Sequence, residues 1–322
     1  MWAYIIRRLL LTIPTVLGVV LLTFVLFSLV AKDPARAYAG KQATEATLKS
    51  IRHEMGIDKP RFLNVPEAHE RGVVYLFDSQ FFDLLRFKFY KSMRYEQSVW
   101  QLIATKGPVS LAIQLPAFFI SLALELVIAL FAAAKRGTGA DYSVTALAVV
   151  TMSVPVLSLY IGAQWLFGAK LAAFPIAGWV PGFYAIQFAA LPILCTVFAQ
   201  WGAGARLYRT VVLDEVSADY VRTASAKGVS KPEVYLTHVL RNVMIPVITN
   251  TVTTLPFLLF GALILERLFQ IPGLGGLLVD AIFSSDRSPV MGITYVTAIA
   301  YCLAVLLSDI LYTLADPRVS LK

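Results

Sequence analysis

Residues 9–30 read LLLTIPTVLGVVLLTFVLFSLV and contain no charged side chain. A helix needs about 20 predominantly apolar residues to cross a bilayer, so this stretch predicts a membrane span. Five later stretches carry at most one charged residue each, and they are residues 108–134, 142–168, 186–205, 244–265 and 288–308. The sequence therefore predicts an all-α integral membrane protein with six transmembrane helices.

The composition supports the same class of protein. Hydrophobic residues make up 58% of the 322 residues and charged residues 15%, whereas a soluble domain carries about 25% charged residues. A soluble chain this apolar would expose large hydrophobic patches, and a disordered chain would be far more polar. The net charge of +8 fits basic residues that flank spans and face lipid headgroups, so we expect membrane lipid and no nucleic acid as partners.

The distribution of basic residues predicts the topology. Arg7 and Arg8 precede the first span and no clear cleavage site follows it, so the N-terminus is expected in the cytoplasm. An even number of spans returns the C-terminus to the same side. The short outer loops then hold only Lys170, Arg267 and Arg287, and the other basic residues of the short loops lie inside.

This topology divides the chain into three segments. They are an N-terminal transmembrane helix (1–31), an extracytoplasmic segment (32–106) and a five-helix core (107–322) with a cytoplasmic loop (206–243). In the extracytoplasmic segment, Leu48, Ile51 and Met55 recur at helical spacing, and Gly56 can end that helix. The second half of this segment is rich in Phe, Tyr and Trp, which fits either an interfacial aromatic belt or a docking surface.

No enzymatic motif occurs in the sequence. His53 and Glu54 begin an HExxH pattern, but Ile57 stands where the second histidine is needed, and the three histidines are far apart. A GxxxxGK[ST] phosphate-binding loop and a GxSxG motif are also absent. We therefore expect no catalytic residue, metal or cofactor on this chain, and a membrane-embedded hydrolase would lack every motif that it needs.

Glu125 is the clearest ionisable residue inside a predicted span. Ionisable groups are costly to place in a membrane, so each is a candidate for a functional role. A single glutamate is more often a bundle-facing residue that is bonded to a neighbouring helix. Both interpretations of this possible polar site stay open.

The cytoplasmic loop predicts two helices separated by a tight break. Val216, Tyr220 and Ala224 share one helix face, and Gly228 can adopt the left-handed conformation that ends a helix. Residues 230–233 then form a capping box for a second helix that runs into the fifth span. The loop is therefore either a plain connection or a lever whose first helix sits in a groove of a partner.

This loop resembles the EAA loop of binding-protein-dependent ABC importer permeases, and most closely that of the dipeptide/oligopeptide group. The matching residues are Tyr220-Val221-Arg222-Thr223-Ala224, Ala226-Lys227-Gly228, His238, Leu240-Arg241-Asn242 and Pro246. Similar stretches are YIIRRLLLTIPTVLGV at residues 4–19, residues 266–275 with the turn IPGLG, Asp309–Tyr312 and Asp316-Pro317-Arg318. Residues 87–92 (FKFYKS) depart from the GDxGxS turn that is usual in the group. The microcin-C type of oligopeptide permease also varies there and is nearest overall.

The resemblance implies a type I ABC importer permease fold in the bacterial cytoplasmic (inner) membrane. It implies uptake of peptides that an extracytoplasmic binding protein delivers, a second homologous permease subunit, and two separate ATPase subunits that hydrolyse the ATP. It assigns coupling to the ATPases to Tyr220, Arg222, Ala224, Ala226, Lys227 and Gly228. It assigns an outer gate or a contact with the binding protein to Glu266, Phe269, Pro272, Gly273 and Gly275.

The outer stretch also has a local interpretation. Pro272 and Gly273 suit the central positions of a type II turn, and Leu274, Leu277 and Leu278 form a short apolar face. The competing function for the whole chain is a secondary carrier or channel that needs no ATPase partners. The sparse charge inside the spans and the structured cytoplasmic loop count against it.

Overall fold

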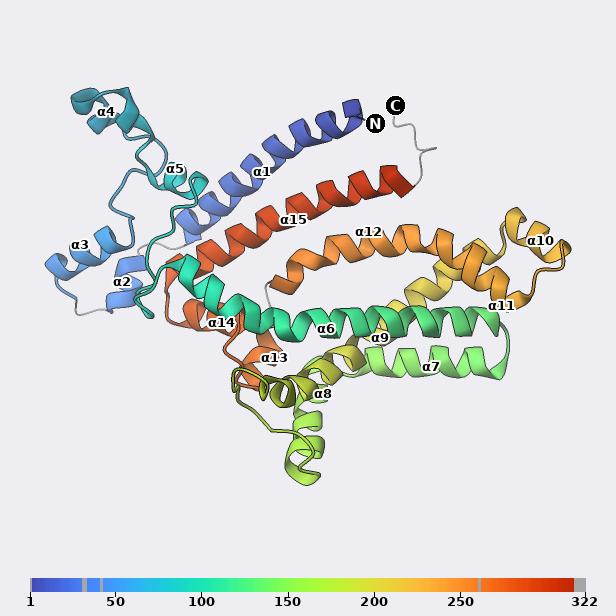
Figure 1. Cartoon of the computed structure of the whole chain (residues 1–322). Coiled ribbons are helices and arrows are strands. Elements are labelled where there is room, and N and C mark those ends of the chain that lie inside the picture. Colours follow the sequence, from blue (N-terminus) through green and yellow to red (C-terminus); the bar gives the residue numbers. More distant parts are fainter. Residues whose placement is uncertain (1, 31–33, 41–42, 260–261, 316–322) are drawn as a thin grey trace. The chain divides into compact units, whose positions relative to one another are not determined.

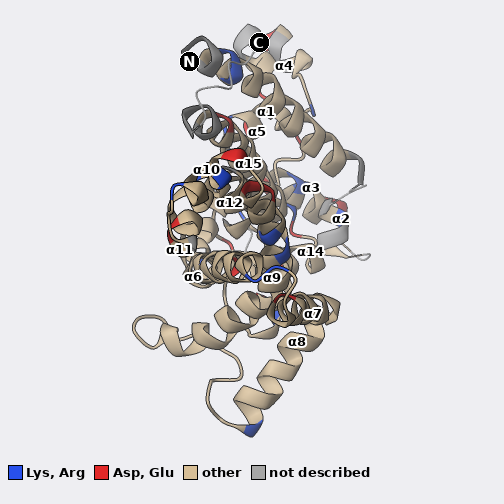
Figure 2. Cartoon of the chain, turned by 90° about the vertical axis from the view of Figure 1, so that its right-hand side faces the viewer, with Lys and Arg blue, Asp and Glu red and all other residues tan. Residues whose placement is uncertain are grey.

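The computed structural model describes residues 2–30, 34–40, 43–259 and 262–315 (Figure 1). Within these ranges the secondary structure is helical, and the only strand-like pairing is an isolated antiparallel bridge between Lys91 and Ser98. Charged side chains are sparse along the long helices (Figure 2). The predicted all-α fold class is confirmed.

In the part of the chain that the structure describes, five helices are long and apolar enough to cross a membrane. They are Ile6–Ser28, Val99–Ala134, Ala185–Val216, Pro246–Leu268 and Arg287–Ile310. The remaining predicted span, residues 142–168, forms α7 (Gly139–Ser153) and a continuous helical stretch of α8 (Val156–Ala163) and η2 (Gln164–Lys170). These two parts are bent by 92°, so the chain has five spans, or six if the bent pair counts as one.

The bend between α7 and α8 lies at Pro155. Proline has no backbone N–H, and it disfavours the helical conformation at the residue before it. Val154 accordingly has φ −80° and ψ 123°, and it ends α7. Pro155 itself becomes the N-cap of α8. The structure thus shows where the predicted span 142–168 bends, which its apolar composition does not reveal.

The chain forms two compact units. The first comprises residues 1–110, 259–263 and 272–306, and the second comprises residues 111–258, 264–271 and 307–322. The boundary between the two units cuts through individual helices. One of these is α6 (Val99–Ala134), which is divided after residue 110.

The first unit holds the N-terminal helices together with most of α15 (Arg287–Ala315). Its other elements are α1 (Trp2–Val30), α2 (Pro34–Ala39), α3 (Glu45–Glu54), α4 (Val65–Arg71), η1 (Val73–Phe77), α5 (Gln80–Leu85), the first part of α6, and α14 (Leu274–Phe283). Phe24 on α1, Leu84 on α5 and Tyr295 on α15 belong to one buried apolar cluster. This cluster joins α1, α5 and α15.

Helix α3 forms where the apolar spacing predicts it. The Thr44 hydroxyl caps its N-terminus by accepting a backbone hydrogen bond from the first turn. Leu48 and Met55 are buried in a local cluster, and Gly56 follows the helix with φ +64°. The ring of Tyr90 lies directly against Gly56, where it leaves no space for a side chain.

A buried charge cluster stabilises the second half of the extracytoplasmic segment. The buried Asp83 carboxylate accepts hydrogen bonds from Lys59 Nζ at 3.0 Å and from the Tyr90 hydroxyl at 2.6 Å, and Lys59 also donates to Asp78 at 2.6 Å. Burial opposes the charge of Lys59, but the bonds to Asp78 and Asp83 outweigh it and raise the pKa of the ammonium. Burial and the bond to Asp83 also raise the pKa of the Tyr90 phenol.

The second unit holds the remaining helices. They are the rest of α6, α7, α8, η2, α9 (Ala185–Val216), α10 (Asp219–Ala226), α11 (Lys231–Glu233), η3 (Val234–Val239), and most of α12 (Leu240–Leu259) and α13 (Leu263–Leu268). A bidentate ion pair joins α7 to α9, because Arg209 donates to both oxygens of the buried Asp141 at 2.7 Å. Paired in this way, a buried carboxylate is satisfied without water.

Candidate functional site

The segment after α9 has the predicted form of helix, break and helix. Helix α10 ends at Ala226, Gly228 adopts φ +82°, and α11 begins directly after Ser230. From α11 the chain continues through η3 into α12 without a gap. Helix α9 extends to Val216, so the first part of the predicted loop 206–243 is a helical extension of the fourth span.

One face of α10 is packed against the helix bundle. Val221 and Ala224 are 6% and 8% exposed, and Tyr220 is partly buried beside them. They belong to a cluster with residues of α6, α9, η3 and α12, namely Ala129, Ala133, Tyr208, Val212, Val234, Val239, Val243 and Val247. The predicted face of Val216, Tyr220 and Ala224 is confirmed, and Val221 joins it. Val221 could have been found by the same periodicity, since it lies three residues before Ala224.

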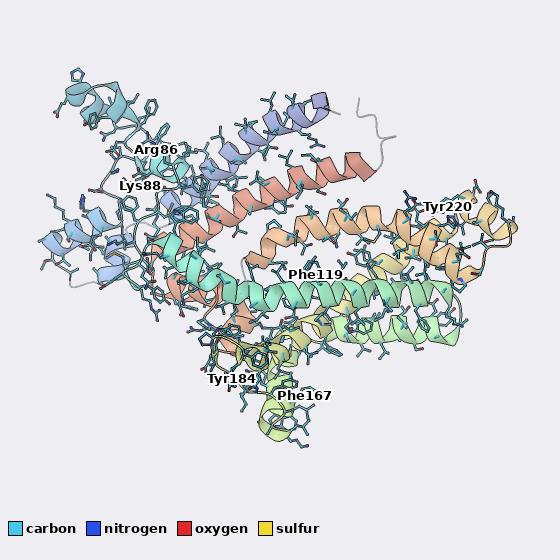
Figure 3. All side chains as sticks on the ribbon, viewed as in Figure 1. Arg86, Lys88, Phe119, Phe167, Tyr184 and Tyr220 are labelled. Atoms are coloured by element: carbon cyan, nitrogen blue, oxygen red, sulfur yellow. The ribbon has the colours of Figure 1, made fainter. Side chains whose placement is uncertain are left out.

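Tyr220 ties α10 to the end of α9. Its hydroxyl donates a hydrogen bond to the Glu215 carboxylate at 2.6 Å (Figure 3). Burial and this hydrogen bond raise the pKa of the Tyr220 phenol. The contact fixes the angle between the two helices, because both groups are anchored on helical backbone.

The opposite face of α10 is exposed. Arg222, Ala226, Lys227 and Gly228 lie on it or just beyond its end, and all four are exposed. Arg222 has one ion pair with Asp219 at 3.6 Å, and both side chains are exposed, so the pair adds little stability. The six predicted coupling residues therefore divide into a packed pair, Tyr220 and Ala224, and an exposed set.

A hollow of about 810 Å³ lies beside α10. Its lining comes from α6, α9, α10 and η3, and it includes Lys135, Val221, Arg222, Ser225 and Tyr235. The lining thus combines an apolar floor with two basic side chains. A hollow of this kind can take a protruding side chain of a partner protein.

The predicted outer residues of the second unit are buried. Glu266 and Phe269 are 1% and 2% exposed. The Phe269 ring meets the Tyr160 ring edge-on at 6.4 Å, and the Phe269 carbonyl accepts a hydrogen bond from Gly178 N at 2.8 Å. Phe269 therefore holds the loop that contains Gly178, and Glu266 is buried within the same unit.

The predicted outer residues of the first unit begin α14. The type II turn expected at Pro272 and Gly273 is wrong, because that turn needs a positive φ at Gly273. Gly273 has φ −93° and ψ −175° and is the N-cap of α14, while Gln270 takes the positive φ of this stretch. The Leu274 N–H donates to the Ser110 hydroxyl at 2.8 Å, and Gly275 is buried on α14.

The apolar face predicted on this stretch is confirmed. Leu274, Leu277 and Leu278 form one buried cluster with Leu102 of α6 and Ile293 of α15. The start of α14 is thereby fixed by three leucines, and it is not a free turn.

Glu125 lies between helices of the second unit. It is 9% exposed on α6, and its carboxylate occupies the place that a side chain on Gly204 of α9 would take. Its charge also acts on Tyr208, whose hydroxyl accepts a hydrogen bond from the Asn250 amide at 3.0 Å. No cation pairs with Glu125 among the residues that the structure describes. Glu125 therefore faces the bundle, with Gly204 and Tyr208 as its neighbours, and a transport role for this residue stays a prediction.

A groove of about 530 Å³ runs between α9 and α12, and most of its exposed lining is apolar. Tyr208, Thr249, Asn250 and Thr253 supply its polar lining. Sequence reasoning missed this groove because each threonine or asparagine alone is unremarkable in a span. The spacing of Thr249, Asn250 and Thr253 on one helix face was the available signal.

The segment that lacks the glycines of the GDxGxS turn is held by aromatic contacts. Phe87 stands in place of the first glycine and still has the left-handed φ of 56°. The Phe87 and Phe89 rings pack on Tyr295 with centroids 5.2 and 5.8 Å away, and Trp100 Nε1 donates to the Phe87 carbonyl at 3.2 Å. Ser92 donates from its hydroxyl to the buried Asp286 at 2.5 Å.

Sequence comparison finds relatives along nearly the whole chain. Residues 125–321 match the family described as binding-protein-dependent transport system inner membrane component, and residues 1–114 match the N-terminal part of such components. A Brucella suis protein named for a peptide transport system permease is 36% identical over 323 residues, which is 99% of each chain. The Salmonella typhimurium glutathione transport system permease protein GsiC is 33% identical over 321 residues, again 99% of each chain. DdpB of Escherichia coli, named for a D,D-dipeptide transport system permease, is 31% identical over 94% of this chain and 93% of its own.

The apolar helices and the packed α10 define a multi-pass membrane permease. The chain belongs to the family of inner membrane components of binding-protein-dependent transport systems. It is the permease subunit of an ABC importer, and it works with further proteins of that system. The fold class and the inner-membrane location expected from the resemblance are confirmed, and the placement of both termini in the cytoplasm stays a prediction.

Proposed function

We propose that this permease imports peptides that an extracytoplasmic binding protein delivers. It pairs with a second homologous permease subunit, and two ATPase subunits on the cytoplasmic side drive the cycle. The names of three relatives support a peptide or peptide-like substrate, since they refer to peptides, a D,D-dipeptide and glutathione. ATP is hydrolysed on the ATPase subunits, and this chain needs no cofactor or metal.

The observation that carries the coupling role is the two-faced packing of α10. Its exposed face, with Arg222, Ala226 and Lys227, docks on an ATPase subunit in the helix-in-groove mode. Its buried face, with Val221 and Ala224, is packed against η3 and α12. Movement of the ATPase therefore tilts α12, because a close-packed apolar contact transmits displacement.

The groove between α9 and α12, with the polar side chains that α12 adds to it, is the part of the pathway that this chain supplies. Polar side chains inside spans face either other helices or an aqueous path. Thr249, Asn250 and Thr253 offer hydroxyl and amide groups that match the N–H and C=O groups of a peptide backbone. Contacts to the backbone allow transport of peptides whose side chains differ.

The outer gate is formed by the stretch around Phe269 and the start of α14. The Phe269 carbonyl holds the loop at Gly178, Glu266 is buried, and Pro272, Gly273 and Gly275 lead into α14. The binding protein acts on this stretch by shifting the balance between two arrangements that it binds with different affinity. The buried side chains become available only in the second arrangement.

A reconstitution experiment tests this function. The tagged chain is purified with the proteins that accompany it, and uptake of a labelled dipeptide and of a labelled hexapeptide is measured in proteoliposomes. We expect uptake only when ATP, the ATPase subunits and the binding protein are all present. Uptake of solute by this chain alone, without ATP, would contradict the proposal and establish a secondary carrier or channel.

A further inference from the structure

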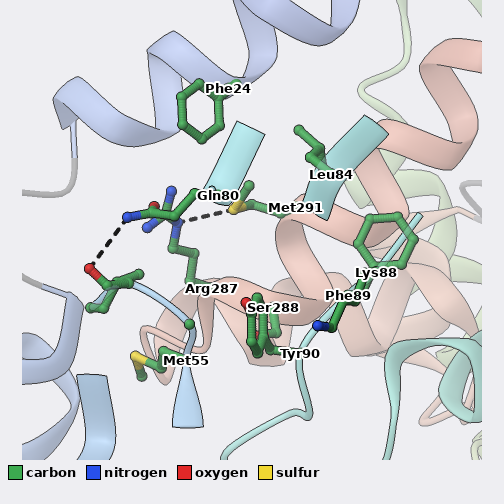
Figure 4. Close-up of a pocket in the computed structure, with 12 residues that line it drawn as sticks. Phe24, Met55, Gln80, Leu84, Lys88, Phe89, Tyr90, Arg287, Ser288 and Met291 are labelled. Carbon is green, nitrogen blue, oxygen red and sulfur yellow. Dashed lines mark hydrogen bonds between the residues drawn. The ribbon is translucent and has the colours of Figure 1, made fainter. Parts of the chain in front are cut away.

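A cation without a carboxylate partner lies at the start of α15, within the first unit. Arg287 donates from Nε to the Met291 sulfur at 2.9 Å, and none of the described residues forms an ion pair with it (Figure 4). Arg61 adds a like charge close enough to act on Arg287. A guanidinium stays charged in a protein, so this half-buried group favours an anionic partner, and the described residues provide none that pairs with it.

A small cavity lies beside this arginine. It has a volume of about 40 Å³, and Arg287, Ser288 and Lys88 contribute polar lining while Phe24 and Met291 contribute apolar lining. A water molecule needs about 10–15 Å³ of such space, so the cavity has room for the oxygens of one small oxyanion. The Lys88 ammonium lies 3.9 Å from Asp83 and is 60% exposed, which leaves it able to turn toward a ligand.

The cavity lies where two predicted spans end. Phe24 belongs to the last turns of the span Ile6–Ser28, and Arg287 is the first residue of the span Arg287–Ile310. Two aromatic side chains that contact the lining are 44% exposed: Phe62 meets Phe24 at 5.3 Å, and Trp100 meets Phe89 at 5.5 Å. Exposed aromatic rings at the end of a span are typical of the headgroup level of a membrane.

We propose that Arg287 and Arg61, with Lys88, bind the phosphate of a phospholipid headgroup. The guanidinium matches two phosphate oxygens at once, and basic pockets between spans are known headgroup sites. Met291 and Phe89 add apolar lining to the same cavity beside the phosphate. An acidic side chain of another protein would satisfy the charge equally well, but it would not account for the apolar lining and the exposed rings beside it.

The test measures lipid binding to the full-length chain with the proteins that accompany it. The sample is stripped of lipid in detergent, and phosphatidylglycerol is titrated while native mass spectrometry counts bound lipid. We expect Arg287→Gln and Arg61→Gln each to weaken the tightest binding at least about tenfold, since each removes a charge-assisted contact. Arg86→Gln is the matched control, because Arg86 is an exposed arginine of the same segment outside the cavity lining (Figure 3).

Each outcome decides the proposal. Unchanged lipid binding in both variants would overturn it, and Arg61→Gln gives the answer if Arg287→Gln fails to fold, since Arg61 is exposed. Inorganic phosphate that binds the stripped protein as tightly as phosphatidylglycerol would overturn the lipid assignment in favour of a free anion. An effect of Arg287→Gln on the affinity for the binding protein, with lipid binding unchanged, would overturn it in favour of a protein carboxylate.

Discussion

The Glu125 carboxylate of α6 fills the space that a side chain on Gly204 of α9 would need. The carboxylate is the end of a flexible side chain, so a methyl group at position 204 would force it to rotate away from this place. The contact also buries an ionisable group against a helix face that has no side chain of its own. The present position of the Glu125 carboxylate thus requires glycine at position 204.

Gly204→Ala is expected to destabilise the permease by no more than about 1 kcal/mol, because the added methyl group displaces only the flexible end of the Glu125 side chain. Thermal unfolding of the purified protein in detergent measures the effect. Gly18→Ala is the control, since no other atom lies within 4 Å of the position of its new methyl group and alanine favours helix.

The same contact predicts coupling between the two positions. Glu125→Ala removes the colliding carboxylate, so the double variant with Gly204→Ala is expected to lose less stability than the sum of the two single variants. Purely additive losses would show that Gly204 acts through another neighbour.

The two faces of α10 predict opposite effects for one substitution. Ala224→Glu places a charge in the buried cluster and is expected to cost about 1–3 kcal/mol of stability and to reduce transport. Ala226→Glu lies on the exposed side, so stability is expected to change by less than about 0.5 kcal/mol while ATP-driven uptake falls. Thermal unfolding and peptide uptake are measured on both variants. Equal stability losses at both positions would remove the distinction between a packed face and a docking face.

The cluster around Asp83 predicts a loss of stability at alkaline pH. The folded state raises the pKa of Lys59 and of Tyr90 above their ordinary values of 10.5 and 10.0. A group whose pKa rises on folding contributes its full stabilisation below the ordinary value, and the contribution disappears as the pH passes through the raised value. Unfolding temperatures are therefore expected to fall as the pH rises above about 10.

Two variants test whether the cluster around Asp83 causes this pH dependence. Lys59→Met and Tyr90→Phe are expected to flatten the alkaline part of the profile, because each removes one titrating group. Lys49→Met removes an exposed lysine of α3 and should leave the profile as it is. A profile unaffected by Lys59→Met and Tyr90→Phe would assign the alkaline loss to other groups.

The left-handed conformation of Phe87 predicts that two glycine substitutions differ in how much they destabilise the protein. Phe87→Gly and Phe89→Gly each remove a ring that packs on Tyr295. At position 87, glycine also relieves the strain of the φ of 56°, which is worth about 1 kcal/mol. At position 89, glycine adds about 0.5–1 kcal/mol of backbone entropy cost. Phe87→Gly is therefore expected to be the milder change in thermal unfolding, and the reverse order would show that position 87 carries no strain.

Much of the architecture follows from local patterns. The apolar stretches predict the spans, the spacing of Leu48, Ile51 and Met55 predicts α3, and Gly228 predicts the break after α10. These predictions work because span length, helix periodicity and the left-handed preference of glycine depend on neighbours along the chain.

Several local expectations were incomplete for one common reason. The bend at Pro155, the extended conformation of Gly273 and the left-handed conformation of Phe87 all depend on what the surrounding helices contact. Each backbone is compatible with more than one conformation in isolation, and packing selects one of them.

The sequence by itself determined the membrane class, the helical segments and the family. Only the tertiary structure decided which side chains meet: Glu125 with Gly204, Arg209 with Asp141, and Asp83 with Lys59 and Tyr90. The physical reason is the range of the interactions involved. Hydrophobic periodicity can be recognised within a few consecutive residues. A buried charge, in contrast, can be paired with any residue that the fold brings within hydrogen-bond distance.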